Sequence, residues 1–525
     1  MSFFSNNYNY DIIIVGGGIS GLFTGYKLSE TGLRILIIES SERLGGRIKT
    51  IHTNDILYES GAARFHKTHT KLLSLINELD LKNDIIELPE KIDYILRKGK
   101  KYKTENKLTL NELLNEAILK SKKMKKDKLI NITFFQYLVL IFDFETAQFI
   151  KDSIGYDAEI IHLNAYAAIT MFKNDLFKDN KYFSLKNGLS SIIENLEEKI
   201  NKKKNIIIKK GTTVKEVYKD HIITTNGDNF NFKDLILTIP SEKIKEIDYF
   251  KENSLIDSVK PIKLLRIYAK YPVKDLWFKN INRTITDNYI RHIIPIDYSK
   301  GLIMLSYTDD KYCELWKNYS HINEKFLIKS LHKEIIDLFE IEPPNPIMIS
   351  TEYWENGFHV WDTGYDTNEI YESMIKPTND NIYICGESYS KKQGWIEGSL
   401  ETCYEVIQNL PLKGIKIVSN KTKIKRKKIL MPIEDIIKNR NLIILDHNGE
   451  KPIYDISKWI PKHPGGAIIK NVGVEANKYY LPNKNKKYNK SPYQIFKTIH
   501  TKEVIEKYLI NENKYVKKVG FLDEK

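Results

Sequence analysis

The stretch YDIIIVGGGISG, residues 10–21, decides the fold of the N-terminal part of this chain. Its first half is a short apolar and β-branched run, and its second half is a glycine-rich turn that leads into a helical pattern. This order predicts a strand, a tight turn and a helix. Gly16 would permit the turn, Gly18 would let the backbone approach a pyrophosphate, and Gly21 would allow close packing of the helix. The N-terminus of that helix would stabilise the phosphate charge.

A second predicted strand, residues 34–38, ends at Glu39. The spacing is the one at which a carboxylate reaches the ribose hydroxyls of a bound dinucleotide. The next residues are SSERLGGR, residues 40–47, and a plain NAD-binding domain does not require them. This segment resembles the glycine-doublet signature of the FAD-dependent amine oxidases. The resemblance implies that Arg47 neutralises the cofactor's pyrophosphate, and it favours FAD over NAD.

The resemblance continues in NIYICGESYSKKQGWIEGS, residues 381–399, which is similar to the second flavin motif of the same family. Gly386 opens this motif directly after a predicted strand. By resemblance, Glu387 would bind the ribityl chain of the flavin, and Trp395 would stand beside the isoalloxazine ring. The backbone at Ile396 would donate to the pyrimidine end of that ring.

Between these two motifs, residues 211–217 and 226–240 resemble the hairpin and strand on the adenine side of the family's cofactor, with Val214 as the adenine contact. The resemblance implies an α/β fold, in which a glycine-doublet, Rossmann-like FAD/NAD(P)-binding domain is interleaved with a mixed α+β substrate domain. Residues 70–181 are expected to be helical. The expected boundaries are 10–70, 182–245 and 375–412 for the FAD-binding domain, 71–181 and 246–374 for the substrate domain, 413–431 for a linker, and 432–525 for a C-terminal module.

Flavin-dependent amine oxidation needs a neutral amine, held with its α-hydrogen against the flavin in a site that excludes water. Aromatic side chains that line the site can both hold the amine in position and exclude water. Trp395 is one such wall by resemblance, and Trp361 in GFHVW, residues 357–361, occupies the place of the other. The alternative is that Trp361 is a core aromatic residue. This segment contains no cysteine, whereas monoamine oxidases carry there the residue that bonds covalently to flavin, so non-covalent FAD is expected.

The segment ESGAARFHKTH, residues 59–69, bears on the substrate. It resembles the L-amino acid oxidase pattern in which an arginine clamps the substrate carboxylate, and Arg64 stands at that position. A guanidinium makes a two-point contact with a carboxylate, and an enzyme for simple amines would leave this charge unpaired. The alternative is that Arg64 pairs with an internal acid or with the flavin.

The chain departs from the family at one position. The lysine that holds a water near the reactive nitrogen of the flavin aligns with Arg266, in LRIYAKYP, residues 265–272. An arginine does not readily lose its proton, so the handling of oxygen or water is expected to differ.

The leading hypothesis is oxidation of an amine or L-amino acid to an imine, with oxygen or a haem as electron acceptor. The alternatives are another glycine-doublet reaction, such as that of a desaturase or a mutase, and an inactive flavin-binding scaffold.

The C-terminal module contains IYDISKWIPKHPGG, residues 453–466, which resembles the haem-binding motif of cytochrome b5. By resemblance His463 is one axial ligand of a haem b, and His500, in FKTIH, residues 496–500, is the other. The interval between the two histidines is longer than is usual in that family. The alternative is therefore a module that keeps the fold and has lost the haem.

The composition of the chain limits which partners and which cellular compartment we expect. The chain has 525 residues and a net charge of +14, but its lysines are scattered and no nucleic-acid-binding motif accompanies them. We therefore expect a small-molecule amine or amino acid substrate, with oxygen or an electron-transfer partner, and no nucleic acid. The three cysteines form no C-x-x-C pair, and the sequence has neither a signal-peptide pattern nor a long apolar run. These features predict a cytoplasmic protein without a membrane anchor.

Overall fold

The computed structural model describes residues 8–53, 55–97, 108–173 and 181–412, together with four short strands of the C-terminal region. The chain divides into two compact units, Met1–Ile417 and Val418–Lys525. Among the described residues, none of the helices has both the length and the apolar character needed to cross a membrane.

The first unit contains a seven-stranded sheet of order β10-β11-β12-β1-β2-β9, with β18 paired to β12. Strands β18, β12, β1, β2 and β9 run parallel to one another, whereas β10 and β11 are antiparallel. Strand β2 and the C-terminal parts of β1 and β12 are continuous buried apolar runs, as expected for parallel strands covered on both faces. The strands are β1 (Tyr8–Val15), β2 (Ile35–Ile38), β9 (Ile206–Lys209), β10 (Val214–Val217), β11 (His221–Thr224), β12 (Asn229–Leu237) and β18 (Ile382–Ile384).

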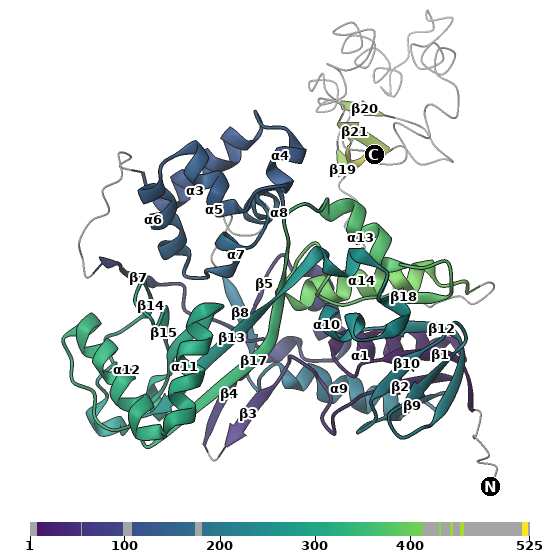
Figure 1. The fold of residues 1–525 in the computed structure, drawn as a ribbon, viewed down its shortest axis with the longest axis horizontal. Helices are drawn as coiled ribbons and strands as arrows, with labels where there is room; N and C mark the ends of the chain where they lie inside the picture. Colours follow the sequence, from purple (N-terminus) through teal and green to yellow (C-terminus); the bar gives the residue numbers. More distant parts are fainter. Residues whose placement is uncertain are drawn as a thin grey trace, which may run out of the picture. The chain divides into compact units, whose positions relative to one another are not determined.

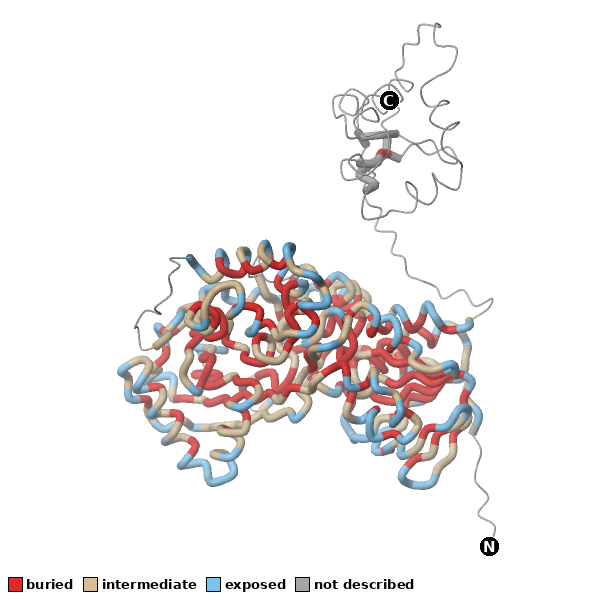
Figure 2. The backbone as a smooth tube through the Cα atoms, turned by 45° about the horizontal axis from the view of Figure 1, so that its top comes forward, coloured by how far each residue is buried: buried red, intermediate tan, exposed pale blue. Residues whose placement is uncertain are grey.

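Helices pack around this sheet, and α1 contacts both α9 and α14 (Figure 1). The strand, turn and helix predicted from residues 10–21 are confirmed, because β1 leads directly into α1. The buried residues are concentrated in the strands and in the helix faces that cover them (Figure 2). These helices include α1 (Ile19–Leu28), α2 (Thr70–Glu78), α9 (Ser190–Asn201) and α14 (Ile396–Asn409).

A second sheet in the same unit has six strands in the order β17-β13-β16-β15-β14-β7. Helix α11 (Lys311–Ile322) packs on β13, β16 and β17, and α12 (Glu324–Phe339) packs on α11. The side chain of Trp316 is buried in the core between this helix pair and the sheet. The strands are β7 (Ile92–Ile95), β13 (Val259–Lys270), β14 (Arg283–Thr286), β15 (His292–Asp297), β16 (Leu302–Asp309) and β17 (Met348–Trp361).

A group of helices follows β7 along the chain (Figure 1). Thr109 and Thr133 begin two of them with capping boxes, in which the threonine and a glutamate or glutamine three residues later satisfy each other's backbone N–H groups. The helices are α3 (Leu110–Ser121), α4 (Lys126–Ile130), α5 (Phe134–Ile141), α6 (Phe144–Ile154), α7 (Ala158–Ile161) and α8 (Ala165–Met171).

The expectation that residues 70–181 are helical throughout is wrong in one stretch. Residues 85–95 contain the strands β6 (Ile85–Glu87) and β7, because their isoleucines pair with strands that follow much later in the chain. Strand β6 joins β8 (Tyr182–Leu185) and β5 (Phe65–His66) in a three-stranded sheet. The remaining elements of the unit are β3 (Thr50–Thr53), β4 (Ile56–Glu59), α10 (Ser241–Lys245), α13 (Thr367–Ile375) and 3-10 helices at Ser29–Thr31, Lys82–Asp84, Asp248–Phe250, Ser254–Ser258, Val273–Asp275 and Tyr298–Lys300.

In the second unit the described residues form a four-stranded sheet of order β19-β22-β21-β20. Both predicted haem ligands, His463 and His500, lie outside the described residues. The strands are β19 (Leu430–Met431), β20 (Leu442–Ile444), β21 (Pro452–Asp455) and β22 (Lys517–Leu522).

Candidate active site

The loop between β1 and α1 leaves open space at the N-terminus of the helix. Gly16 has φ +112°, a conformation that L side chains rarely adopt, and a Cβ on Gly21 would lie 1.9 Å from the carbonyl oxygen of Gly16. A Cβ on Gly18 would meet no atom within 4 Å. Gly18 is the N-cap, and the first turn of α1 contains no acidic residue. The free N–H groups of this turn therefore suit an anionic group.

The glycine doublet lies against this loop. The N–H of Gly45 donates to the carbonyl of Gly17 at 2.8 Å, and both Gly45 and Gly46 have positive φ. At the end of β2, Glu39 accepts from the N–H of Gly17 at 2.6 Å and from the N–H of Ser41 at 2.9 Å. The predicted acidic residue thus borders the glycine loop.

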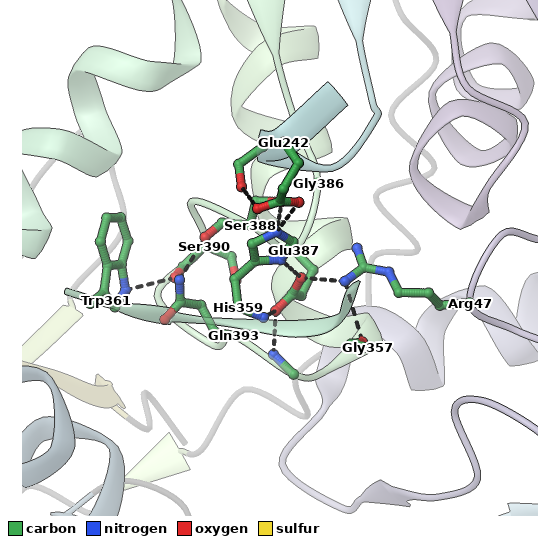
Figure 3. A network of polar contacts seen from close by, with 12 residues as sticks. Arg47, Glu242, Gly357, His359, Trp361, Gly386, Glu387, Ser388, Ser390 and Gln393 are labelled. Carbon is green, nitrogen blue, oxygen red and sulfur yellow. Dashed lines mark hydrogen bonds and ion pairs between the residues drawn. The ribbon is translucent and has the colours of Figure 1, made fainter. Parts of the chain in front are cut away.

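Glu387 is the centre of a buried polar network (Figure 3). One carboxylate oxygen, Oε2, accepts from Nη1 of Arg47 at 2.7 Å, and Oε1 accepts from the N–H groups of His359 and Gly394 at 2.9 and 2.8 Å. Burial would raise the pKa of the Glu387 carboxyl, but the charges of Arg47 and His359 and the hydrogen bonds hold it well below its usual range. Arg47 and Glu387, assigned separately from the sequence, therefore form one ion pair.

The imidazole of His359 lies between two carboxylates. Its Nδ1 is 2.8 Å from Oε2 of Glu387, and its Nε2 is 3.3 Å from Oε2 of Glu242. Full burial lowers the pKa of this imidazole, but the two carboxylates outweigh burial and raise it above its ordinary value. His359 is thus favoured as an imidazolium in this network.

A cavity of about 300 Å³ lies beside the network. Trp361 and Trp395, the two predicted aromatic walls, both line it. Trp361 is 3% exposed, and its Nε1 donates to the carbonyl of Ser390 at 3.2 Å (Figure 3). The other side of the cavity is formed by residues of α7 and α8, including Glu159 and Tyr166.

Arg64 lies next to this cavity, against its aromatic wall. Its guanidinium carbon is 4.4 Å from the ring centroid of Tyr182 and 6.0 Å from that of Trp395, and these two rings stack at 6.0 Å. Its Nη2 donates to the hydroxyl of Tyr156 at 3.2 Å. Within the described part of the chain Arg64 forms no ion pair, so the internal acid considered as its partner is not seen there.

A second guanidinium near Arg64 also lacks a carboxylate. Arg283 begins β14, and its buried Nε has no hydrogen-bond partner among the described residues. Burial lowers the pKa of Arg283, and the positive charge of Arg64 lowers it further. The neighbourhood of Tyr156 and Tyr182 therefore carries an excess of positive charge.

Arg266, which replaces the family's lysine, is held rigidly. It is 5% exposed, its Nη1 donates to the carbonyl oxygens of Glu59, at 2.9 Å, and Gly61, and its guanidinium carbon lies 4.4 Å from the ring centroid of Tyr307. Burial would lower the pKa of this group, but the tyrosine hydroxyls raise it. Arg266 is a fixed cation and stays protonated near neutral pH.

Sequence reasoning missed one residue, Glu159, on the short helix α7. It lines the cavity, and its carboxyl has neither an ion pair nor a hydrogen bond among the described residues. Burial, reinforced by the nearby carboxylate of Asp309, raises the pKa of Glu159 to about 7, although Arg64 opposes the shift. The available signal was a single acid among apolar neighbours in AEII, residues 158–161.

The other predicted cofactor residues lie on separate elements. Gly386 follows β18 with φ +145°, and its N–H donates to Oγ1 of Thr402 at 2.8 Å. Ile396 is the first residue of α14, and Val214 is the first residue of β10.

Comparison with known proteins places this geometry in context. A solved structure of wild-type putrescine oxidase bound to putrescine superposes with a TM-score of 0.60 at 15% identity, covering 77% of this chain and 100% of that chain. An uncharacterized protein of Acanthamoeba polyphaga mimivirus is 21% identical over 76% of this chain and 93% of its own length. Flavin-containing amine oxidase A of Sus scrofa is 35% identical over 94 residues, and that match covers 18% of each chain.

The family model described as flavin containing amine oxidoreductase matches residues 19–406. This range begins directly after the glycine loop, at the first residue of α1, and runs into α14. It includes the glycine doublet, the Arg47–Glu387 pair and the residues that line the cavity. The chain belongs to the flavin containing amine oxidoreductase family.

Proposed function

We propose that this protein oxidises the amine of an L-amino acid to an imine, which water then hydrolyses to the oxo acid and ammonia. One observation carries the choice of substrate: in the described residues the Arg64 guanidinium has no carboxylate partner and lies against the aromatic wall of the cavity. A substrate carboxylate would satisfy this charge with two parallel hydrogen bonds. The neighbouring charge of Arg283 favours an anionic group at the same place.

FAD is the cofactor that the family implies, and the residues present fit it. Gly16, Gly18 and Gly21 shape the turn and the open space at the N-terminus of α1, where a diphosphate would be held. Glu39 would hold the adenosine ribose. The further contacts proposed are Arg47 for the phosphates, Val214 for the adenine, and Gly386, Glu387 and Ile396 for the flavin side.

When bound, FAD supplies the acceptor for the two electrons removed from the substrate C–N bond. The chain's own contribution is positioning. Trp361 and Trp395 would exclude water and orient the amine, and Arg64 would fix the substrate by its carboxylate. We propose non-covalent FAD, because residues 357–361 offer no cysteine.

An anaerobic substrate panel tests this proposal. L-amino acids are expected to bleach the flavin absorbance of the purified protein, while amines without a carboxylate do so much more slowly. Bleaching by a hydrophobic polyene alone would instead support a desaturase, and no bleaching by any compound would support a binding scaffold.

For the electron acceptor we propose oxygen or a haem b held by residues 432–525. The support is the b5-like motif around His463 together with the downstream His500. With haem supplied, a low-spin bis-histidine spectrum is expected, and it should be lost in His463→Ala and His500→Ala. A wild-type protein without a Soret band would contradict the haem proposal and leave the flavin chemistry untouched. A reducing cytoplasmic location is proposed from the three cysteines, which are buried and free.

A further inference from the structure

We infer that Glu159 accepts the proton of the substrate's ammonium group and thereby generates the neutral amine that is oxidised. This inference rests on the proposed function. It concerns a residue that no sequence motif marks, and it divides substrate recognition between two side chains, Arg64 for the carboxylate and Glu159 for the amine.

The position of Glu159 is the first argument. Glu159 lines the same cavity as Trp361 and Trp395, and this is the space where the reacting amine would be held. The other acid in the cavity wall, Glu401, is paired with Lys392 at 3.0 Å. Glu159 has no such partner among the described residues, and a carboxylate partly withdrawn from water without a partner is costly unless a ligand supplies one.

Charge complementarity is the second argument. The Arg64 guanidinium lies 4.4 Å from the ring centroid of Tyr182, and the charges of both Arg64 and Glu159 act on the Tyr182 hydroxyl, so the two groups lie in one neighbourhood. An α-amino acid is a zwitterion that carries a carboxylate and an ammonium on one carbon. A cation and an acid close together beside the cavity match that pair of charges.

The proton balance is simple. The ammonium N–H bond breaks, an O–H bond forms on the Glu159 carboxylate, and the nitrogen keeps its electron pair, so no electrons leave the substrate in this step. A neutral amine results, as the oxidation requires. Arg64 and Arg266 cannot take this proton because guanidinium groups stay protonated.

The surroundings of the Glu159 carboxyl favour its role as a proton acceptor. Burial and the carboxylate of Asp309 raise the pKa of Glu159 to about 7, so the group can both accept and release a proton near neutral pH. The titratable and charged groups around it and along the cavity are Asp309 on β16, Arg64 before β5, Tyr182 on β8, Tyr166 on α8, His359 on β17, Lys391 and Lys392 before α14, and Glu401 on α14.

The first test compares Glu159→Gln with the matched cavity variant Glu401→Gln in the FAD-loaded protein. For the wild type, the anaerobic rate of flavin bleaching by L-amino acids should rise with pH through about 7, as Glu159 ionises. Glu159→Gln should be slower by about 10²-fold or more at neutral pH, and its rate should keep rising at higher pH, where free amine is supplied by solution. Glu401→Gln removes an acid that is already paired with Lys392, so it should keep the pH dependence of the wild type, whatever its absolute rate. A wild-type profile in Glu159→Gln overturns the inference.

The second test reads proton exchange without turnover. The probe is 2-aminoisobutyrate, an amino acid that lacks the α-hydrogen, bound at about pH 6 and followed by calorimetry in two buffers of different ionisation enthalpy. The wild type should release close to one proton per bound ligand, because binding of the ammonium ionises Glu159. Glu159→Gln should bind more weakly and release none. Equal proton release in both proteins overturns the inference.

The two failures are distinguishable. If no amine bleaches the wild-type flavin, the proposed function fails and the role of Glu159 falls with it. If the wild type is bleached and Glu159→Gln behaves like Glu401→Gln, only the role of Glu159 is wrong. Should Glu159→Gln fold poorly, Glu159→Asp retains a carboxylate and is expected to keep the pH dependence at a lower rate.

Discussion

Two groups of charged side chains, one buried and one partly buried, involve residues in or next to α7, and they differ in how their charges are balanced. In the first, Arg291 is fully buried, 2.9 Å from Asp157 and 3.7 Å from Asp152, and Lys151 lies 3.2 Å from Asp152. Two cations thus face two carboxylates. In the second group, Arg64, Arg283 and Glu159 have no ion-pair partner among the described residues.

This difference distinguishes charged side chains that stabilise the fold from charged side chains that can bind a ligand. A buried charge whose partners come from its own chain stabilises one conformation and leaves nothing for a ligand to satisfy. A charge that the chain leaves unpaired beside a cavity has a cost that a ligand can remove. The short helix α7 therefore links the two groups, because Asp157 directly precedes it and Glu159 lies within it.

The largest effect is expected in the balanced cluster. Arg291→Met leaves Asp157 buried without its closest cation, so the free energy of unfolding should fall by about 3–5 kcal/mol. Chemical denaturation of the FAD-loaded protein measures this change. Arg64→Met is the matched control in the unbalanced group and should alter stability far less. Similar losses in both variants would show that the two groups do not differ in this way.

The second effect concerns catalysis. Arg64→Met should weaken stabilisation of the transition state for L-amino acids by about 2–4 kcal/mol, because it removes the charge that positions the carboxylate. The ratio kcat/KM measures the loss, and the flavin absorbance should show that FAD stays bound. Full activity of this variant on L-amino acids would contradict the assignment of Arg64.

The third effect is a pH dependence within the balanced cluster, and it is the smallest of the three when read over one pH unit. Burial and the charge of Asp157 raise the pKa of Asp309 from 3.8 to about 7, because a third carboxylate would be uncompensated there. The folded protein then binds the proton more tightly than the unfolded chain does, so stability is full below about pH 4 and falls as pH rises towards 7, by about 1 kcal/mol per pH unit. Asp309→Asn should flatten this slope in denaturation curves, and an unchanged slope would assign it to another group.

Sequence reasoning reached the nucleotide side of the molecule because its determinants are local. Gly16, Gly18 and Gly21 lie within one strand, turn and helix, and Glu39 follows on the neighbouring strand. Residue type and spacing are enough to predict such a unit.

The substrate side could not be predicted in the same way. Glu159 becomes meaningful only when α7 is brought beside Arg64 and Trp395, and no short-range pattern specifies that approach. Strand β7 was missed for a related reason, because its partner β14 follows almost two hundred residues later in the chain. The hydrogen bond between Arg97 and Asp287, just beyond these strands, also joins residues that are 190 positions apart. Aromatic walls were identifiable by resemblance, but the unpaired acid that faces them was not.

The ion pair between Arg47 and Glu387 has a consequence for biosynthesis. Its two residues are 340 positions apart, and β18, which carries Gly386 and Glu387 at its end, must insert beside β12 to bring them together. A nascent chain that has emerged only as far as β12 has the glycine loop but neither this pair nor α14. We therefore expect the ribosome to have translated almost all of the first unit before the protein can retain FAD. Cofactor binding would then follow synthesis of this unit and would not direct its folding during translation.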